Sequence, residues 1–228
     1  MLSRRFITAL GVLGLPSAYA FAQAESVTGL WSDHLAAARA EALAFIRDHP
    51  SEISTYLHLI TARLIARQDI PSSQLATVPW ANTGIEFGSS NPAPPFAIVE
   101  FRLAPGTLLP PHNHPHTSVA TIMLEGQATV DNFELEQGSA PPGANGAALL
   151  RHTHRSVLRP RDVNMVMPSR NNLHALKAGP HGARGIDLTT QYQTDGAFGF
   201  LRMLDPANIG GVLRAEWVDP TTQQITWD

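Results

Sequence analysis

The sequence predicts a mainly β domain, a sandwich or a barrel, that follows a helical segment near the N-terminus. Two patterns indicate this fold class. From residue 71 onwards, prolines and glycines separate short runs rich in Val, Ile, Phe and Thr, which is typical of strands joined by turns. Residues 30–68 instead carry apolar side chains three or four positions apart, the spacing of one face of a helix.

The helical segment is divided by a break at Pro50-Ser51. Trp31-Ser-Asp33 offers a cap for a first helix. The apolar positions before and after the break are Leu35, Ala38, Ala42, Phe45, Ile46, Ile53, Leu57, Ile60 and Leu64. We therefore expect an N-terminal helical hairpin, ending near Arg67, that packs on the β domain.

The β domain should contain seven or more short strands. The runs that predict them are 84–87, 96–103, 119–124, 128–133, 149–158, 164–167 and 185–188. The polar and glycine-rich stretch from Ser139 to Gly146 predicts a long hairpin loop. The resulting domains are an N-terminal helical subdomain at 25–70 and a β-barrel at 71–228.

Residues 1–24 predict an export signal. Arg4-Arg5 precedes a short apolar run, and small residues follow up to Ala24, which is the pattern of a charged region, a hydrophobic region and a cleavage site. The paired arginines resemble a twin-arginine signal, and an ordinary secretory signal or a membrane-tethered N-terminus is the alternative. The expected location of the protein is the periplasm, with no membrane contact in the mature form.

Composition excludes several functions. Without the signal, 14 Lys and Arg stand against 19 Asp and Glu, a net charge of −5 with no basic run, which argues against nucleic acid and anionic membranes. The chain has no cysteine, so disulfides and thiolate ligands are ruled out. Any metal must be held by His, Asp or Glu.

Three His-x-His pairs occur, at 112/114, 114/116 and 152/154. On a strand, residues two apart point to the same face, so His112 and His114 could reach one ion. Gly106 lies six residues before the first pair, at a turn into this strand, and Gly126 follows the next apolar run, where a further turn is expected. The pair at 152/154 lies between arginines, which oppose a cation, so these two histidines are expected on an exposed strand.

The spacing of Gly106, His112, His114 and Gly126 resembles the first motif of the cupin superfamily, Gly-x5-His-x-His-x(3–4)-Glu-x6-Gly. Val119 occupies the position of the motif's glutamate. The resemblance implies a double-stranded β-helix, or jelly-roll, barrel whose third metal ligand comes from a later strand. His174 fits that second motif.

Residues 80–195 further resemble the plant cysteine oxidase and cysteamine dioxygenase family, whose cupins carry three histidines and no glutamate. Residues 112–133 match the pattern His-x-His-Pro, an apolar strand, a glycine turn and a strand ending on an aromatic residue. The second block matches at Met167, Pro168, Asn172, His174, Gly185, Asp187, Leu188 and Tyr192. The sequence departs from the family at Asn171, where a glycine is usual, and at Gln191, where a proline is usual.

This resemblance implies a mononuclear Fe(II) thiol dioxygenase. His112, His114 and His174 would be the metal ligands, Asp187 would orient a ligand histidine or the substrate amine, and Tyr192 would donate an outer-sphere hydrogen bond. The substrates would be O2 and a thiol: a small aminothiol, cysteine or a Cys-terminated peptide. Another metal-dependent cupin dioxygenase and a non-catalytic periplasmic metal- or ligand-binding cupin are the alternatives.

Three other candidate residues lie near the motifs. Pro115 bends the strand before His116, so His116 is expected beside the ligands or in solvent. Arg102 and Arg184 are candidates for a carboxylate clamp by their proximity to the motifs alone.

Overall fold

A computed structural model describes residues 31–54, 56–57, 60, 77–80, 83–93, 95–144, 146–193, 196–209 and 211–218. Its helical elements are α2 (Trp31–Asp48) and the 3-10 turn η2 (Pro50–Glu52). Its strands are β1 (Val78–Pro79), β2 (Ile85–Ala93), β3 (Phe96–Leu103), β4 (Leu108–Asn113), β5 (Thr117–Leu135), β6 (Ala148–Leu158), β7 (Val163–Val166), β8 (Leu173–Gln191), β9 (Phe200–Ile209) and β10 (Val212–Val218). The predicted signal at 1–24 lies outside the described residues.

Helix α2 buries one face, as its periodicity predicts. Leu35, Ala38, Ala42 and Phe45 are buried in one apolar cluster with barrel residues from β3, β5 and β8. Asp33 lies in the first turn and Arg47 in the last, which suits the helix dipole at both ends. No helix in the described part of the chain is long and apolar enough to cross a membrane.

The chain turns back after α2 because Pro50 opens a 3-10 turn at the predicted break. Helical conformation resumes at Ile53, and Tyr56 stacks on Phe45 with ring centroids 3.8 Å apart. The buried residues Ile53, Leu57 and Ile60 belong to the same cluster as α2. The rest of the predicted second helix, including Leu64, lies outside the described residues.

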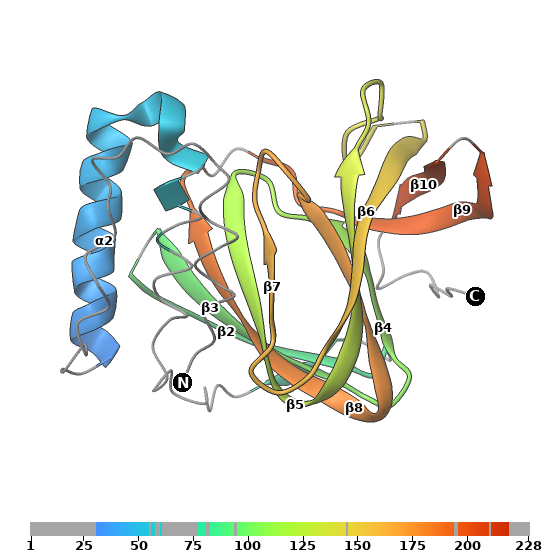
Figure 1. The fold of residues 1–228 in the computed structure, drawn as a ribbon, viewed down its shortest axis with the longest axis horizontal. Coiled ribbons are helices and arrows are strands. Elements are labelled where there is room, and N and C mark those ends of the chain that lie inside the picture. The colour runs from blue at the N-terminus through green and yellow to red at the C-terminus, as the bar shows by residue number, and fades with distance from the viewer. Residues whose placement is uncertain are drawn as a thin grey trace. The chain divides into compact units, whose positions relative to one another are not determined.

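Six antiparallel strands close into a barrel (Figure 1). Around the ring the order is β8-β4-β9-β10-β6-β5, and β5 pairs with β8 to complete it. Strands β3, β2 and β1 extend the wall beyond β8, while β7 pairs with β5. The predicted mainly β barrel with an N-terminal helix is confirmed.

Strands β5 and β8 pair along their whole lengths, which joins the two halves of the barrel. The sequence predicted a turn at Gly126 between two strands, and this was wrong: β5 is continuous and only bulges there. Gly126 has φ +68, and a Cβ on it would lie 2.2 Å from the carbonyl oxygen of Gly182, itself at φ +78. The two glycines allow both strands to bend sharply while remaining paired.

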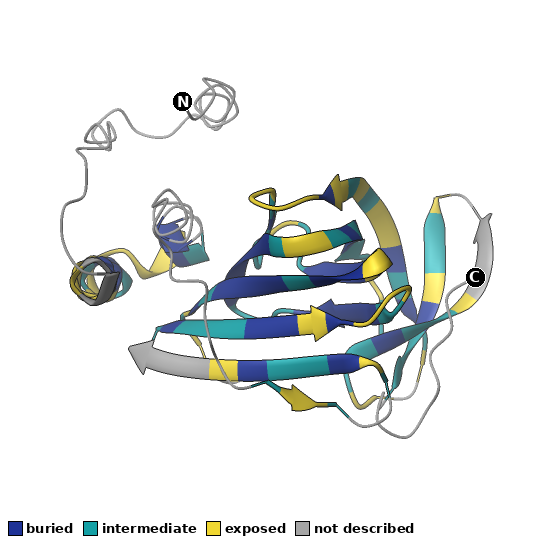
Figure 2. Ribbon diagram, turned by 90° about the horizontal axis from the view of Figure 1, so that it is seen from below, coloured by how far each residue is buried: buried dark blue, intermediate teal, exposed yellow. Residues whose placement is uncertain are grey.

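Apolar side chains fill the interior beside this bend. Met123, Val130 and Leu176 are buried in one cluster with Phe101, and Phe133, Leu150 and Leu173 form a second. Figure 2 shows buried and exposed bands alternating along several strands, the pattern expected when one face of a strand points inward.

The C-terminal strands complete the barrel and were not predicted. Strand β9 pairs with β4 through His112 and Phe200, and β10 pairs with β6. Their sequence contains Asp205-Pro206 and Gly210-Gly211, turn signals that hide the strand pattern. The predicted loop 139–146 is confirmed as the connection between β5 and β6.

Candidate metal centre

Two of the predicted histidines face each other across neighbouring strands. His112 on β4 is paired in register with His174 on β8, so both side chains lie on the same face of the sheet. His114 follows β4 directly and begins a turn in which its carbonyl accepts a hydrogen bond from Thr117. The His-x-His spacing thus brings His114 beside the other two.

The three Nε2 atoms converge. His174 Nε2 lies 3.0 Å from His112 Nε2 and 3.0 Å from His114 Nε2. His112 and His174 are 4% and 0% exposed, whereas His114 is partly accessible. Among the described residues, this group of possible metal ligands contains no carboxylate, in agreement with Val119 at the motif's glutamate position.

The geometry suits one transition-metal ion. If each nitrogen lies about 2.1 Å from an ion, a separation of 3.0 Å between two nitrogens corresponds to an angle of about 90° at the ion. Adjacent ligands of an octahedral ion subtend this angle, whereas a tetrahedral ion requires about 109°. An octahedral ion with three imidazole ligands retains positions for other ligands.

The tautomer of His112 also suits a metal. Its Nδ1 lies 2.8 Å from the carbonyl oxygen of Pro110. A carbonyl only accepts hydrogen bonds, so Nδ1 carries the proton and donates it, which leaves the lone pair of Nε2 for an ion.

His174 is backed by a pair of buried amides. Asn132 and Asn164 exchange two hydrogen bonds, of 2.8 and 3.1 Å, and the Asn164 amide lies 3.5 Å from His174 Nδ1. The oxygen and nitrogen of an amide are assigned from such networks. If oxygen and nitrogen are exchanged in both amides, the two hydrogen bonds between Asn132 and Asn164 are kept. The Asn164 oxygen then accepts a hydrogen bond from His174 Nδ1–H, and Nε2 of His174 is free to bind a metal.

Burial keeps all three imidazoles neutral. Burial lowers the pKa of His112 to about 4, against a smaller opposing effect of the Pro110 carbonyl. Burial, and then repulsion from neighbouring histidines, lowers the pKa values of His114 and His174 well below the ordinary value. Neutral imidazole is the form that binds metals.

Asp187 lies on β8 within the same polar interior. Thr121 on β5 is paired in register with both Asp187 and Asn164, and its hydroxyl donates a 2.6 Å hydrogen bond to Asp187 Oδ1. Burial raises the pKa of Asp187 to about 6, although the Thr121 hydrogen bond lowers it. The Nδ1 partners of His112 and His174 are Pro110 and Asn164, so Asp187 is not the hydrogen-bond partner of either ring at Nδ1.

Tyr192 lies just after β8 and faces His116. Its hydroxyl is 3.4 Å from His116 Nδ1, and its backbone N–H donates to the His116 carbonyl. His116 has φ +51, because the chain turns after Pro115 as the sequence predicted. The two rings meet edge to face.

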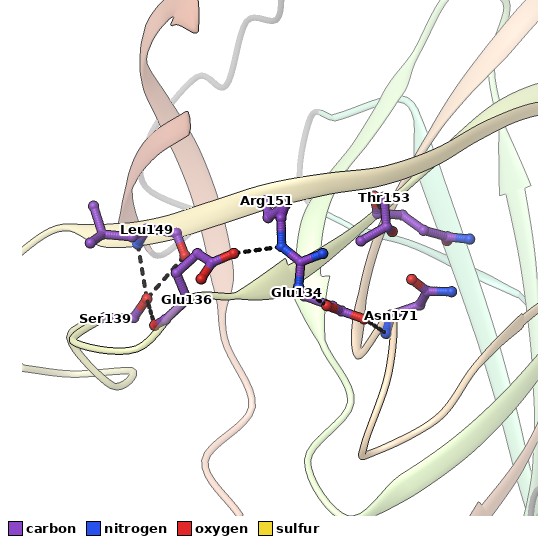
Figure 3. Close-up of polar contacts among 8 residues, drawn as sticks. Glu134, Glu136, Ser139, Leu149, Arg151, Thr153 and Asn171 are labelled. Atoms are coloured by element: carbon purple, nitrogen blue, oxygen red, sulfur yellow. Dashed lines mark hydrogen bonds and ion pairs between the residues drawn. The ribbon is translucent and has the colours of Figure 1, made fainter. Parts of the chain in front are cut away.

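The turn before His174 is anchored from β5 and β6 (Figure 3). The backbone N–H of Asn171 donates to Glu134, which pairs with Arg151, and Arg151 also binds Glu136 at 2.6 Å. Asn171 has φ +52, a left-handed conformation that glycine adopts without strain. The anchored turn fixes where β8 begins and therefore where His174 points.

The other sequence candidates lie elsewhere. Arg184 binds Glu100 and Glu125, both at 2.6 Å, and lines with Arg102 a surface pocket of about 310 Å³ that contains none of the three histidines. His152 is half-exposed and binds Asp131, and His154 is exposed, as expected for that strand.

Sequence reasoning missed Asn132, Asn164 and Thr121. Each is a polar residue at an inward position of an otherwise apolar strand. A period-two pattern interrupted by Asn or Thr is the signal that could have found them.

The closed antiparallel barrel and the histidine triad define a cupin-fold protein with a three-histidine metal-binding site. No protein-family model matches the chain. A curated relative, "Probable 2-aminoethanethiol dioxygenase" of Dictyostelium discoideum, is 27% identical over 95 residues, which are 41% of this chain and 43% of that protein. The chain therefore spans less than half the length of this relative.

Solved structures with similar folds have low sequence identity. KdgF from Halomonas sp. is 18% identical over 55% of this chain and 94% of its own, with a TM-score of 0.39. A Klebsiella pneumoniae protein with a double-stranded β-helix domain is 15% identical over 57% and 97%, with a TM-score of 0.39. The Cnp3 cupin domain of Schizosaccharomyces pombe is 16% identical over 54% and 74%, with a TM-score of 0.38. The order of the strands around the closed barrel defines the fold.

Proposed function

We propose that this protein is an Fe(II)-dependent dioxygenase that converts a thiol to a sulfinate. The observation that carries the proposal is a neutral, buried triad of histidines with no carboxylate among its described ligands. The relative named as a 2-aminoethanethiol dioxygenase supports the same chemistry.

The reaction balances without an added reductant. A thiol R–SH and one O2 give R–SO2H, so both oxygen atoms end on sulfur and the sulfur supplies the electrons. Bound Fe(II) would supply positions for the thiolate and O2 side by side and would mediate electron transfer between them. The protein's own residues would hold the ion, orient the substrate and exclude water from the site.

Each site residue would have a distinct role in this reaction. His112, His114 and His174 hold the ion, with Pro110 and Asn164 fixing the rings of two of them. Asp187, whose carboxyl faces the polar interior, would bind and orient the substrate's amine. Tyr192 would donate a hydrogen bond near the reacting atoms from its position beside His116. Small aminothiols, cysteine and Cys-terminated peptides all carry the required thiol and amine.

Oxygen uptake tests the proposal. The protein is loaded anaerobically with Fe(II) and offered cysteamine, cysteine, a Cys-initiated peptide and non-thiol substrates such as diketones. The expected result is thiol-dependent O2 consumption and a product heavier by two oxygen atoms. Uptake with non-thiol substrates alone would indicate another cupin dioxygenase. Firm metal binding without uptake would indicate a binding protein.

We also propose that residues 1–24 direct export to the periplasm by the twin-arginine route. The support is the Arg4-Arg5 pair ahead of a short apolar run. Fused to a reporter that functions only outside the cytoplasm, this segment should give activity that Arg4→Lys with Arg5→Lys abolishes. Equal reporter activity from both fusions would point to the ordinary secretory route.

A further inference from the structure

A segment of residues 196–199, just before β9, is held next to the histidine triad by Asn113. The Asn113 side chain donates a 2.9 Å hydrogen bond to the carbonyl of Ala197 and accepts one of 2.7 Å from the Gly199 N–H. The Asn113 backbone N–H donates to the Gly199 carbonyl as well. Because Asn113 is buried between two ligand histidines in sequence, the segment is fixed relative to the triad.

Two glycines allow this close approach. A Cβ on Gly196 would lie 2.3 Å from Pro115 Cβ, and one on Gly199 would lie 2.8 Å from the ring of Trp217. The segment therefore packs on the turn that carries His114 at one end and on β10 at the other. Its position is set by sterics as well as by hydrogen bonds.

Phe198, between the two glycines, lies beside the triad. Its ring centroid is 5.8 Å from that of His112 and 6.3 Å from that of His114. It also meets Phe200 edge to face at 5.0 Å, which holds its ring in place. Phe198 nevertheless remains 54% exposed, an unusual state for a phenylalanine that contacts buried histidines.

Phe198 lies beside the partly exposed member of the triad, His114. His174 is fully buried, His112 nearly so, and His114 is the partly exposed member. A molecule that reaches the metal centre past His114 therefore passes next to the Phe198 ring. Phe200 contacts the Phe198 ring, and Pro115 and His116 contact the segment at Gly196.

We propose that Phe198 is a specificity-determining residue that contacts an apolar group of the substrate next to its metal-binding atom. This inference rests on the proposed thiol dioxygenase function and deepens it. Among Cys-initiated peptides, it favours those whose second residue is apolar. Burying that group against an exposed aromatic ring removes apolar surface of both partners from water, which strengthens binding.

Thiol binding tests this role without turnover. The full-length protein is loaded with Co(II) and kept anaerobic, and thiol binding is followed by the absorption of the sulfur-to-metal charge transfer. Dissociation constants are compared for cysteamine, Cys-Gly and Cys-Leu. The wild type should bind Cys-Leu about five- to tenfold more tightly than Cys-Gly, as expected for partial burial of one leucine side chain.

Phe198→Ala should reduce this preference to near unity while cysteamine binding and metal content stay unchanged. Phe198→Leu, which keeps an apolar contact, should retain much of the preference. Leu204→Ala is the matched control, because Leu204 on β9 is a comparably exposed apolar residue, at 44%, with no contact to the triad among those described.

Four outcomes would overturn the assignment. A wild type without preference for Cys-Leu, or a Phe198→Ala variant that keeps it, would remove the role of Phe198. A loss of cysteamine binding that leucine does not restore would show that the ring binds an ammonium group instead. If no thiol binds the metal-loaded wild type, the proposed function itself fails and this inference with it.

Discussion

Two hydrogen-bonded pairs are buried inside the barrel, and they differ in charge. Asn132 and Asn164 are neutral amides that approach His174. Thr121 and Asp187 lie in the neighbouring positions, and this pair contains a carboxyl group whose pKa is raised to about 6 by burial. The amide pair joins β5 to β7, and the Thr121–Asp187 pair joins β5 to β8.

The two pairs differ in whether their charge depends on pH, and this difference suits them to different functions. An amide pair does not titrate, so it can hold a ligand histidine in one tautomer at any physiological pH. A buried carboxyl changes charge near pH 6, so its interactions with a cationic substrate depend on pH. The amides therefore suit metal positioning, and the carboxyl suits substrate binding.

The largest effect is expected at His174, where the amide pair ends. His174→Ala removes the central nitrogen, 3.0 Å from both others, and should lower metal affinity by more than about 100-fold, since loss of an outer partner alone costs 10–100-fold. Metal content after gel filtration measures this. His154→Ala, which removes an exposed histidine of β6, should retain full content. Equal metal in both variants would show that His174 is not a ligand.

Asn164→Leu should lower metal affinity about 10–100-fold, and equally at pH 6 and pH 8, because no titrating group is removed. It also leaves the Asn132 amide buried without its partner, at a cost of about 1–3 kcal/mol of folding stability. Chelator competition gives the affinity and denaturant unfolding gives the stability.

The double variant Asn132→Leu/Asn164→Leu separates these two effects. Removing both amides avoids the unpaired group, so stability should partly recover while metal affinity stays low. Recovery of metal affinity along with stability would indicate that the pair serves packing alone.

Asp187→Asn should change the pH dependence of stability without loss of metal. A carboxyl whose folded pKa is raised stabilises the fold fully below pH 3.8, and this contribution is lost as pH rises through about 6. The free energy of unfolding of the variant minus that of the wild type should therefore increase by about 2 kcal/mol between pH 4 and pH 7. A pH-independent difference would contradict the raised pKa.

Thr121→Val should have the smallest effect. The Thr121 hydroxyl donates to the carboxylate and lowers the pKa of Asp187, so its removal should move the titration of Asp187 to higher pH. The change in folding free energy is about 1 kcal/mol at neutral pH. Carbon-13 NMR of the Asp187 carboxyl follows the midpoint, and a midpoint that moves down would refute the assignment.

Much of the fold was readable from local patterns. Strand β3 was predicted at its observed bounds, and the apolar face of α2 is buried as its spacing required. The continuity of β5 through Gly126 was not readable, because a glycine with positive φ serves a turn and a bulge equally well. Strands β9 and β10 were not predicted, because Pro206 and the Gly210-Gly211 pair interrupt the strand pattern of their sequence.

The sequence by itself determined the metal-binding histidines as a candidate group. The two-residue period of a strand places His112 and His114 together, and the resemblance of the second block to a known motif supplied His174. Only the tertiary structure decided what surrounds them. Strand register brings Thr121 to Asp187, closure of the barrel brings Asn132 to Asn164, and Asn113 holds the segment that brings Phe198 to His112. Strand register depends on the packing of the whole barrel, so a short stretch of sequence does not determine it.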